Sequence, residues 1–447
     1  MKISNKSIFE RIHADENGTP INKDTIQYRL YKINKNGQDI FVLYDDNMDV
    51  ISPAYRYINI AMASQSYNSR EKAMYAVRLL YCFLQLTKTK ITKLKQDDIE
   101  KLKYFLLGYS PEKGSYSMQL QTVRSNATVN GYLNVYRSYL KYINIECDYL
   151  FETKKAIIKG INRMTEKAEL VTSYSSNIKT GTPVQRVPRY ISVDNFPKII
   201  KIIRKDENKM AECIVRIMYQ FGLRLGEVLG LTFEDVVEEN IDGNLYPVLY
   251  IRNRSTDKHF QKAKTCMNIT DKAQFRSKDY KTENYGYQKV IVTYDIYELI
   301  NTYIEDAHSA ARSKNMTRYK SGVSADKAVK DKYETDNYYV FINSIGTALS
   351  EQIWNKYIKS VFKRAEIPID SNSKKTNLNH KFRHGFAMFH VQYRKTPLLE
   401  LQKLMRHASI SSTMVYYNPT EADEAAIKND FVNELYDLIP DLRSGNI

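Results

Sequence analysis

The chain has 447 residues, which is too long for a single hydrophobic core of ordinary size and indicates two or three domains. With 43% hydrophobic and 26% charged residues and no apolar run of the roughly 18 residues that cross a bilayer, the composition is that of a soluble globular protein and excludes a membrane-spanning helix. The formal net charge of +16 favours a polyanionic partner over a neutral one, although a solvated basic surface remains the alternative.

Residues 1–62 form a short mixed segment of unknown role, for which an accessory contact with DNA is one hypothesis. Residues 63–165 have a helical pattern, in which apolar side chains recur every three or four residues. One stretch of this kind contains Met74, Val77, Leu80 and Leu84, and another contains Leu133, Tyr136, Leu140 and Ile143. Lysines and arginines are predicted on the surfaces of these helices. The pattern predicts a small all-helical domain, basic enough to contact a phosphate backbone.

Residues 166–188 lose this periodicity and are rich in Ser, Thr, Gly and Pro, which is the composition of a linker. Two domains joined by an extended basic strap can close around a rod-shaped ligand. We therefore place a second domain at residues 189–420.

The second domain contains an apolar helix, A-E-C-I-V-R-I-M-Y-Q-F, that is predicted to be buried and to end at Gly222. Arg224 follows this break between apolar neighbours, and Glu227 lies three residues further on. Two interpretations remain open at this point. The guanidinium is either directed at a ligand or paired with Glu227 on a surface turn.

Two runs further along, Y-P-V-L-Y-I-R and Q-K-V-I-V-T-Y, are predicted strands. The long basic stretch between them, residues 252–289, is more typical of a functional loop than of an idle one. Ser350 is placed to begin a helix that contains Trp354. The acidic tail, residues 421–447, carries an apolar stripe, which predicts a helix that docks on its own domain or on a neighbour.

His380 and Arg383 are three residues apart, so one helix face presents both. His380, His384 and His390 are alternatively spaced as metal ligands, but no carboxylate ligand lies nearby, so a metal site is disfavoured. The four cysteines (Cys82, Cys147, Cys213 and Cys266) are far apart, which argues against a zinc site or disulfides and fits a reducing cytosol. We expect no cofactor.

The stretch L-M-R-H-A-S-I-S-S-T-M-V-Y-Y joins His407 to Tyr416 nine residues later. Two arginines suit the non-bridging oxygens of a phosphate, because each guanidinium donates two hydrogen bonds in one plane. A tyrosine is a poor nucleophile at its free pKa of about 10, but a cationic site favours the phenolate and a histidine accepts its proton. A lysine is suited to protonate the leaving oxygen. Such a set can break a phosphodiester without a metal.

Three motifs, G-L-R-L-G-E-V-L-G-L, H-K-F-R-H and the stretch ending at Tyr416, occur in this order and resemble the tyrosine recombinase (phage integrase) family. The resemblance covers roughly residues 66–420 and is strongest to integrases of bacterial transposons and other mobile elements. It implies an all-α core-binding domain followed by a mixed α/β, mainly helical catalytic domain of the DNA breaking-rejoining type.

The resemblance also implies roles. Arg224 and Arg383 would bind the scissile phosphate, His380 would act as acid or base, and His407 would hydrogen-bond the phosphate. Tyr416 would be the nucleophile that forms a 3′-phosphotyrosine, with the adjacent Tyr417 as its competitor.

The family's lysine lies between the second and third strands. The segment R-S-T-D-K-H-F-Q-K-A-K-T resembles the one that ends in this lysine, which favours Lys264, with Lys281 as its rival. Arg406 occupies a position where the family frequently has glycine.

The implied function is that of a site-specific DNA recombinase that integrates or excises a mobile element through a Holliday junction. The implied partners are double-stranded DNA, three further copies of the chain in a synaptic homotetramer and, optionally, an accessory excision factor, in the bacterial cytoplasm. The acidic tail would dock on a neighbouring copy. Two alternatives are a type IB topoisomerase-like enzyme that relaxes supercoils and a DNA-binding regulator that does not cut.

Overall fold

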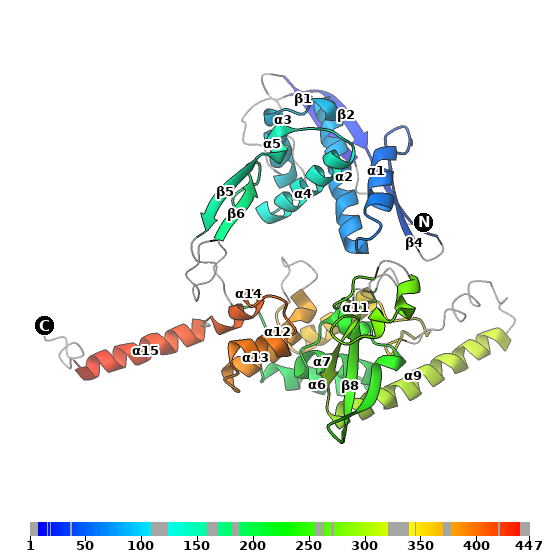
Figure 1. Cartoon of the computed structure of the whole chain (residues 1–447), viewed down its shortest axis with the longest axis vertical. Coiled ribbons are helices and arrows are strands. Elements are labelled where there is room, and N and C mark those ends of the chain that lie inside the picture. The colour runs from blue at the N-terminus through cyan, green and yellow to red at the C-terminus, as the bar shows by residue number, and fades with distance from the viewer. Residues whose placement is uncertain are drawn as a thin grey trace. The chain divides into compact units, whose positions relative to one another are not determined.

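The computed structural model describes residues 8–15, 17, 19–35, 38–108, 124–158, 169–180, 187–254, 261, 263–269, 272–320, 339–344, 346–369, 377–418 and 421–438. The chain divides into two compact units, Met1–Thr182 and Pro183–Ile447 (Figure 1). Residues 166–168 and 181–186 of the predicted linker, 255–260 of the predicted basic loop and 439–447 of the tail lie outside the described residues. No helix in the described ranges is long and apolar enough to cross a membrane.

The first unit begins with two antiparallel hairpins and continues mainly with helices. The hairpins are β1 (Ile8–Ala14) with β2 (Pro20–Gln27), and β3 (Arg29–Lys35) with β4 (Gln38–Tyr44). The helical elements are α1 (Ser52–Arg56), η1 (Tyr57–Ala61), α2 (Tyr67–Thr87), η2 (Ile91–Lys93), α3 (Gln96–Leu107), α4 (Asn126–Tyr142) and α5 (Asp148–Phe151).

The N-terminal segment and the helices share one hydrophobic core. Phe41 and Leu43 of β4 are fully buried in the same cluster as Met74 of α2 and Leu133 of α4. Asn59 joins the two parts, since its Oδ1 accepts a hydrogen bond of 2.9 Å from the backbone N–H of Phe41. The predicted boundary at residue 62 therefore does not separate two cores.

The prediction of an all-α domain at residues 63–165 followed by a linker at residues 166–188 is wrong for one hairpin, β5 (Thr153–Ile158) with β6 (Glu169–Tyr174). The run T-K-K-A-I-I and the run E-L-V-T-S-Y are both rich in β-branched residues, and each completes the backbone hydrogen bonds of the other. The end of β6 is anchored on α4, because Arg137 lies 3.8 Å from the ring centre of Tyr174 and donates a 2.7 Å hydrogen bond to Ser176.

The second unit is mainly helical and contains one antiparallel sheet of order β7-β8-β9, as expected of a mixed, mainly helical domain. Its strands are β7 (Val236–Ile241), β8 (Asn244–Arg252) and β9 (Tyr287–Ile291). Its other elements are α6 (Asn195–Lys205), α7 (Lys209–Gln220), α8 (Leu225–Leu229), η3 (Phe233–Asp235), η4 (Lys272–Arg276), η5 (Asp279–Lys281), α9 (Tyr294–Lys320), α11 (Glu351–Arg364), α12 (Asn377–Gln392), α13 (Leu398–Leu404), α14 (Ser411–Met414), η6 (Val415–Tyr417) and α15 (Glu421–Leu438). Strands β8 and β9 confirm the two predicted strands.

Helix α7 is the centre of the second unit and packs against α6, α8, α9 and α12. The approach of α12 is close, since a Cβ atom at Gly385 would lie 2.4 Å from the ring of Tyr219 on α7. Just after α7, Gly222 adopts a φ of +64°, which turns the chain, and a Cβ there would lie 2.7 Å from Phe386. The predicted break at Gly222 is thus both a sharp turn and a contact with α12.

The start of α12 is held by α11. Ser350 begins α11 as predicted, and its side chain accepts a hydrogen bond from the N–H of Ile353. Trp354 is fully buried and donates a 2.7 Å hydrogen bond from Nε1 to Asn379 Oδ1 on the first turn of α12. This bond fixes the end of α12 that carries His380.

Candidate active site

Arg224, which directly precedes α8, and Glu227, in the first turn of that helix, form the base of the site. The Glu227 carboxylate accepts hydrogen bonds from the Arg224 backbone N–H (2.8 Å) and from its Nη1 (2.7 Å). The side chain of Glu227 is 2% exposed, whereas that of Arg224 is 41% exposed. The predicted pair therefore exists, but its acidic half is buried and its guanidinium remains open to a ligand.

Glu227 also binds arginines from two other segments, and we call Glu227 with Arg224, Arg383 and Arg406 the arginine cluster. Arg406 Nη2 lies 2.7 Å from Glu227 Oε2, and Arg383 Nη1 lies 4.0 Å from the same oxygen. Burial acts to raise the pKa of Glu227, but Arg406, Arg383 and Arg224 outweigh it and hold that pKa below its ordinary value. Glu227 is therefore an anion that gathers three cations.

Arg383 is the most deeply placed of these cations, with 2% of the residue exposed. Its Nη1 donates to the carbonyl of Gly222 and its Nη2 to the carbonyl of Met405. Burial and the neighbouring charge of Arg224 lower the pKa of Arg383 to about 9, so the guanidinium stays protonated at neutral pH. One side chain of α12 thereby joins the turn after α7 to the turn that precedes His407.

The histidines are held neutral around this cluster. His380 is one turn before Arg383 on α12, as predicted, and burial followed by the charges of Arg383 and Arg224 lowers its pKa. The same effects, burial first and then Arg383, lower the pKa of His407 to about 4. His407 Nδ1 lies 2.9 Å from Thr413 Oγ1, which orients the ring.

Tyr416 is buried beside these histidines in η6, with 3% of the residue exposed. Its hydroxyl lies 2.8 Å from Nδ1 of His384, and its ring plane is within 9° of that of His407 at 6.4 Å between centres. Burial raises the pKa of Tyr416, while Arg383 and Arg224 act to lower it. Burial lowers the pKa of His384 to about 3, so at neutral pH the hydrogen-bond partner of the Tyr416 phenol is a neutral imidazole.

Tyr417 points elsewhere. Its hydroxyl donates a hydrogen bond to the backbone carbonyl of Thr396, and the residue is 37% exposed. Burial and the charge of Glu400 raise the pKa of Tyr417. The charges that act on Tyr416 are thus the two predicted arginines, whereas the charge that acts on Tyr417 is a carboxylate.

The two rival lysines are both exposed and lie on different supports. Lys264 follows Ala263, which is buried against Gly230 at the end of α8, and the Ala263 carbonyl accepts a 3.0 Å hydrogen bond from the N–H of Arg254. Lys281 ends η5 on the far end of the same loop. Among the described residues, no hydrogen bond or ion pair joins either lysine to the other five predicted site residues, which the structure does bring together.

The contact between His384 and Tyr416 is not predicted by the sequence, in which His384 is only a candidate metal ligand. Its partner Tyr416 is distant along the chain, and no periodic pattern connects them. One signal was present, since His384 directly follows Arg383 and lies four residues from His380. Nδ1 of His390, the third candidate metal ligand, is 3.0 Å from Thr396 Oγ1 instead.

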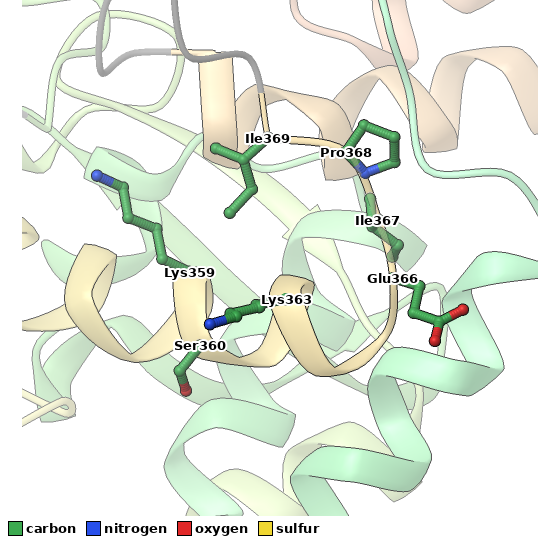
Figure 2. A pocket seen from close by; sticks show the side chains of 7 residues that line it. All are labelled: Lys359, Ser360, Lys363, Glu366, Ile367, Pro368 and Ile369. Carbon is green, nitrogen blue, oxygen red and sulfur yellow. The ribbon is translucent and has the colours of Figure 1, made fainter.

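A cavity of about 590 Å³ lies in the second unit, at the end of α11. Figure 2 shows its lining, which consists of Lys359, Ser360, Lys363, Glu366, Ile367, Pro368 and Ile369. None of these is a predicted site residue. The site is therefore defined by the arginine cluster and Tyr416, and not by this hollow.

The neutral histidines predict a pH-dependent stability. His384 and His407 have folded-state pKa values of about 3 and about 4, below the ordinary value of 6.5. At pH values between these folded-state values and 6.5, the unfolded chain therefore binds more protons than the folded chain. We expect the melting temperature to fall as the pH is lowered from about 7 to about 5. In the double variant His384→Asn, His407→Asn the fall should be smaller; an unchanged slope in calorimetry would contradict the assignment.

An anion-binding arginine cluster, a buried tyrosine and neutral histidines define a class of site suited to phosphoryl transfer through a tyrosine. The chain belongs to the phage integrase family, whose family model matches residues 189–423. That range contains every residue of the arginine cluster, as well as Tyr416.

The curated relatives that match parts of the chain include a transposase and a recombinase. Transposase A from transposon Tn554 of Staphylococcus aureus is 26% identical over 207 residues, which cover 44% of this chain and 55% of the transposase. The chain thus spans about half the length of this relative. Tyrosine recombinase XerC of Natranaerobius thermophilus is 19% identical over 324 residues, which cover 71% of this chain and 87% of the recombinase.

Solved structures of similar proteins include XerH site-specific recombinase bound to its difH substrate, with 16% identity and a TM-score of 0.46 over 80% of this chain and 78% of that chain. The Tn1549 transposon integrase in complex with transposon right end DNA has 17% identity and a TM-score of 0.44 over 82% of this chain and 92% of that chain.

Proposed function

We propose that the chain is a site-specific DNA recombinase of a mobile genetic element that cleaves and rejoins DNA through a 3′-phosphotyrosine and a Holliday junction. Membership of the phage integrase family supports this function, as do the names of the similar transposase and recombinase. The single observation that carries the proposal is the position of Tyr416, whose hydroxyl is buried in the field of Arg383 and Arg224.

In this proposal the exposed guanidinium of Arg224 and the buried one of Arg383 bind the two non-bridging oxygens of the scissile phosphate. Their positive charges stabilise the charge that develops on the pentacoordinate phosphorus. Tyr416 Oη forms the bond to phosphorus while the bond to the 5′-oxygen breaks, and the phenolic proton passes to a neutral histidine. His407 hydrogen-bonds the phosphate, and His380 assists as acid or base.

Energy is conserved in the phosphotyrosine, so strand exchange proceeds without ATP or a metal ion. The proposed partners are double-stranded DNA and three further copies of the chain. An accessory excision factor would set the direction of the reaction, integration or excision. The net charge of +16 favours capture of the DNA.

The function is tested by covalent capture from a pool of nicked duplexes with a randomised segment. Nicking beside the scissile phosphate lets the short 5′-hydroxyl strand diffuse away and traps the intermediate. We expect the full chain to form a denaturant-resistant adduct with an enriched sequence, in the presence of EDTA and without ATP. Absence of any adduct would overturn the proposal, and efficient relaxation of plasmids that lack the enriched sequence would favour a topoisomerase.

We assign Lys264 as the acid that protonates the leaving 5′-oxygen, because its segment is anchored on the end of α8, the helix that begins directly after Arg224. Gln261 donates a 3.1 Å hydrogen bond to the Leu229 carbonyl, and Ala263 packs on Gly230. Lys281 instead lies beside Tyr280, whose carbonyl accepts from Arg252.

Lys264→Ala should therefore slow cleavage of the captured duplex by about 10²–10⁴-fold, the usual contribution of a general acid. A 5′-bridging phosphorothiolate, whose thiolate leaves without a proton, should restore the rate of Lys264→Ala to within a few-fold of the wild-type rate. Lys281→Ala is the matched control and should cleave the ordinary duplex normally. The reverse pattern of loss and rescue would transfer the role to Lys281.

The proposed tetramer uses helix α15 as a contact between copies. Phe431 is 62% exposed and Val432 is 38% exposed, and the neighbouring Asp430 and Glu434 are acidic. An exposed apolar stripe of this kind is stabilised by burial against a partner.

Deletion of residues 421–447 should weaken assembly of two DNA sites into one complex more than binding to a single site. Gel mobility assays with one-site and two-site DNA measure both equilibria. Equal loss of the two would show that the helix has no role between copies.

A further inference from the structure

Arg406 occupies a backbone position that favours glycine. It follows the C-terminus of α13 with a φ of +51°, in the left-handed region, and its N–H donates a 2.9 Å hydrogen bond to the carbonyl of Lys403. Side chains are disfavoured in this conformation, because the Cβ atom crowds the backbone. The backbone conformation at residue 406 therefore disfavours an arginine, yet the chain has one there.

The side chain of Arg406 is directed into the site. It is 9% exposed, and its Nη2 binds Glu227 Oε2 at 2.7 Å. Its Nε is buried and has no hydrogen-bond partner among the described residues. A buried donor left without a partner is uncommon in folded proteins, so this nitrogen is a candidate for a ligand oxygen.

Glu227 binds Arg224 and Arg406 directly, and Arg383 is held further away. Arg383 Nη1 lies 4.0 Å from the oxygen that Arg406 occupies, and it donates instead to the carbonyl of Gly222. The other terminal nitrogen of Arg383 is bound to the carbonyl of Met405, the residue immediately before Arg406. Removal of Arg406 would leave Glu227 Oε2 open to Arg383 at a small displacement.

We propose that Arg406 is a positioning residue that occupies Glu227 Oε2, keeps Arg383 off the carboxylate and adds a third arginine to the site. The three guanidiniums and one carboxylate leave two positive charges, which match the two negative charges of a pentacoordinate phosphorane. This inference rests on the proposed recombinase function, since it concerns cleavage of the same phosphate.

The test uses Arg406→Gly, which removes the guanidinium and suits the left-handed backbone, and Arg406→Lys, which keeps one charge. Lys395→Gly is the matched control, because Lys395 is also cationic with a φ of +52° but is exposed and outside the arginine cluster. Single-turnover cleavage of the duplex recovered by covalent capture gives the rate at saturating DNA, and a filter-binding titration gives the affinity.

We expect Arg406→Gly to slow cleavage by about 10²-fold, the effect of losing one preorganised donor, because Arg383 would move onto Glu227 and away from the phosphate. DNA affinity and melting temperature should stay close to wild type. Arg406→Lys should recover part of the rate, and Lys395→Gly should cleave normally. A crystal structure of Arg406→Gly should show Arg383 hydrogen-bonded directly to Glu227.

An unchanged cleavage rate in Arg406→Gly would overturn the inference, as would a loss that follows affinity or melting temperature. An Arg383 side chain that stays on the Gly222 and Met405 carbonyls in the variant crystal would also overturn it. If the wild-type chain captured no duplex, the proposed function itself would fail, which is a distinct result. The variant crystal structure does not depend on activity and would still decide the position of Arg383.

Discussion

Tyr416→Phe is expected to abolish the covalent adduct with DNA, with a loss of at least about 10⁴-fold, because it removes the phenol on which the charges of Arg383 and Arg224 act. Phenylalanine keeps the packing of the buried ring. The variant loses only the hydrogen bond to His384, so its free energy of unfolding should change by about 1 kcal/mol. Adduct formation on the captured duplex and chemical denaturation measure the two effects separately.

Tyr417→Phe is the matched control for this prediction. It removes the same hydroxyl one residue later, where the partner is the Thr396 carbonyl. Its adduct should form at nearly the wild-type rate. An adduct that survives in Tyr416→Phe but disappears in Tyr417→Phe would reverse the assignment of the nucleophile.

Glu227→Gln is expected to lower the free energy of unfolding by about 3–5 kcal/mol and to reduce cleavage together with it. Glu227 is 2% exposed and accompanied by three guanidiniums, so its loss leaves buried positive charges without their counter-ion. Glutamine keeps one acceptor oxygen but no negative charge, so Arg224 Nη1 loses its ion pair and the guanidinium is freer to turn away from the phosphate.

Glu212→Gln distinguishes this effect from the loss of any shielded carboxylate. Glu212 is on α7, 9% exposed, and binds Arg204 at 2.7 Å, away from the arginine cluster. Its replacement should destabilise the fold without slowing cleavage by the folded fraction. If Glu212→Gln slowed cleavage as much as Glu227→Gln, then Glu227 would have no specific role in the site.

Local chemistry in the sequence was sufficient for some of these features. The turn at Gly222, the start of α11 at Ser350 and the shared face of His380 and Arg383 all follow from interactions within a few residues. The three motifs predicted which distant residues form one site. In the structure, Arg224 and Arg383 lie at the Glu227 carboxylate, and His380, His407 and Tyr416 lie near these arginines.

Features that depend on long-range packing could not be predicted. Residues 169–174 lie in a stretch, 166–188, whose composition as a whole is that of a linker, yet they become a strand because β5 supplies the hydrogen bonds and Arg137 supplies a contact for Tyr174. Likewise, Glu227 looked equally suited to a surface turn. Its burial depends on Arg383 and Arg406, which come from segments more than 150 residues further along the chain.

The two hydrogen bonds of Arg383 have a consequence for folding. They join carbonyls of Gly222 and Met405, segments that are far apart in the sequence, and contacts of this range form late because closing long loops costs entropy. In the proposed recombinase, a partly folded chain would keep its net charge of +16 while Tyr416 is not yet beside the arginines. The proposed binding of DNA would then arise earlier in folding than the proposed cleavage.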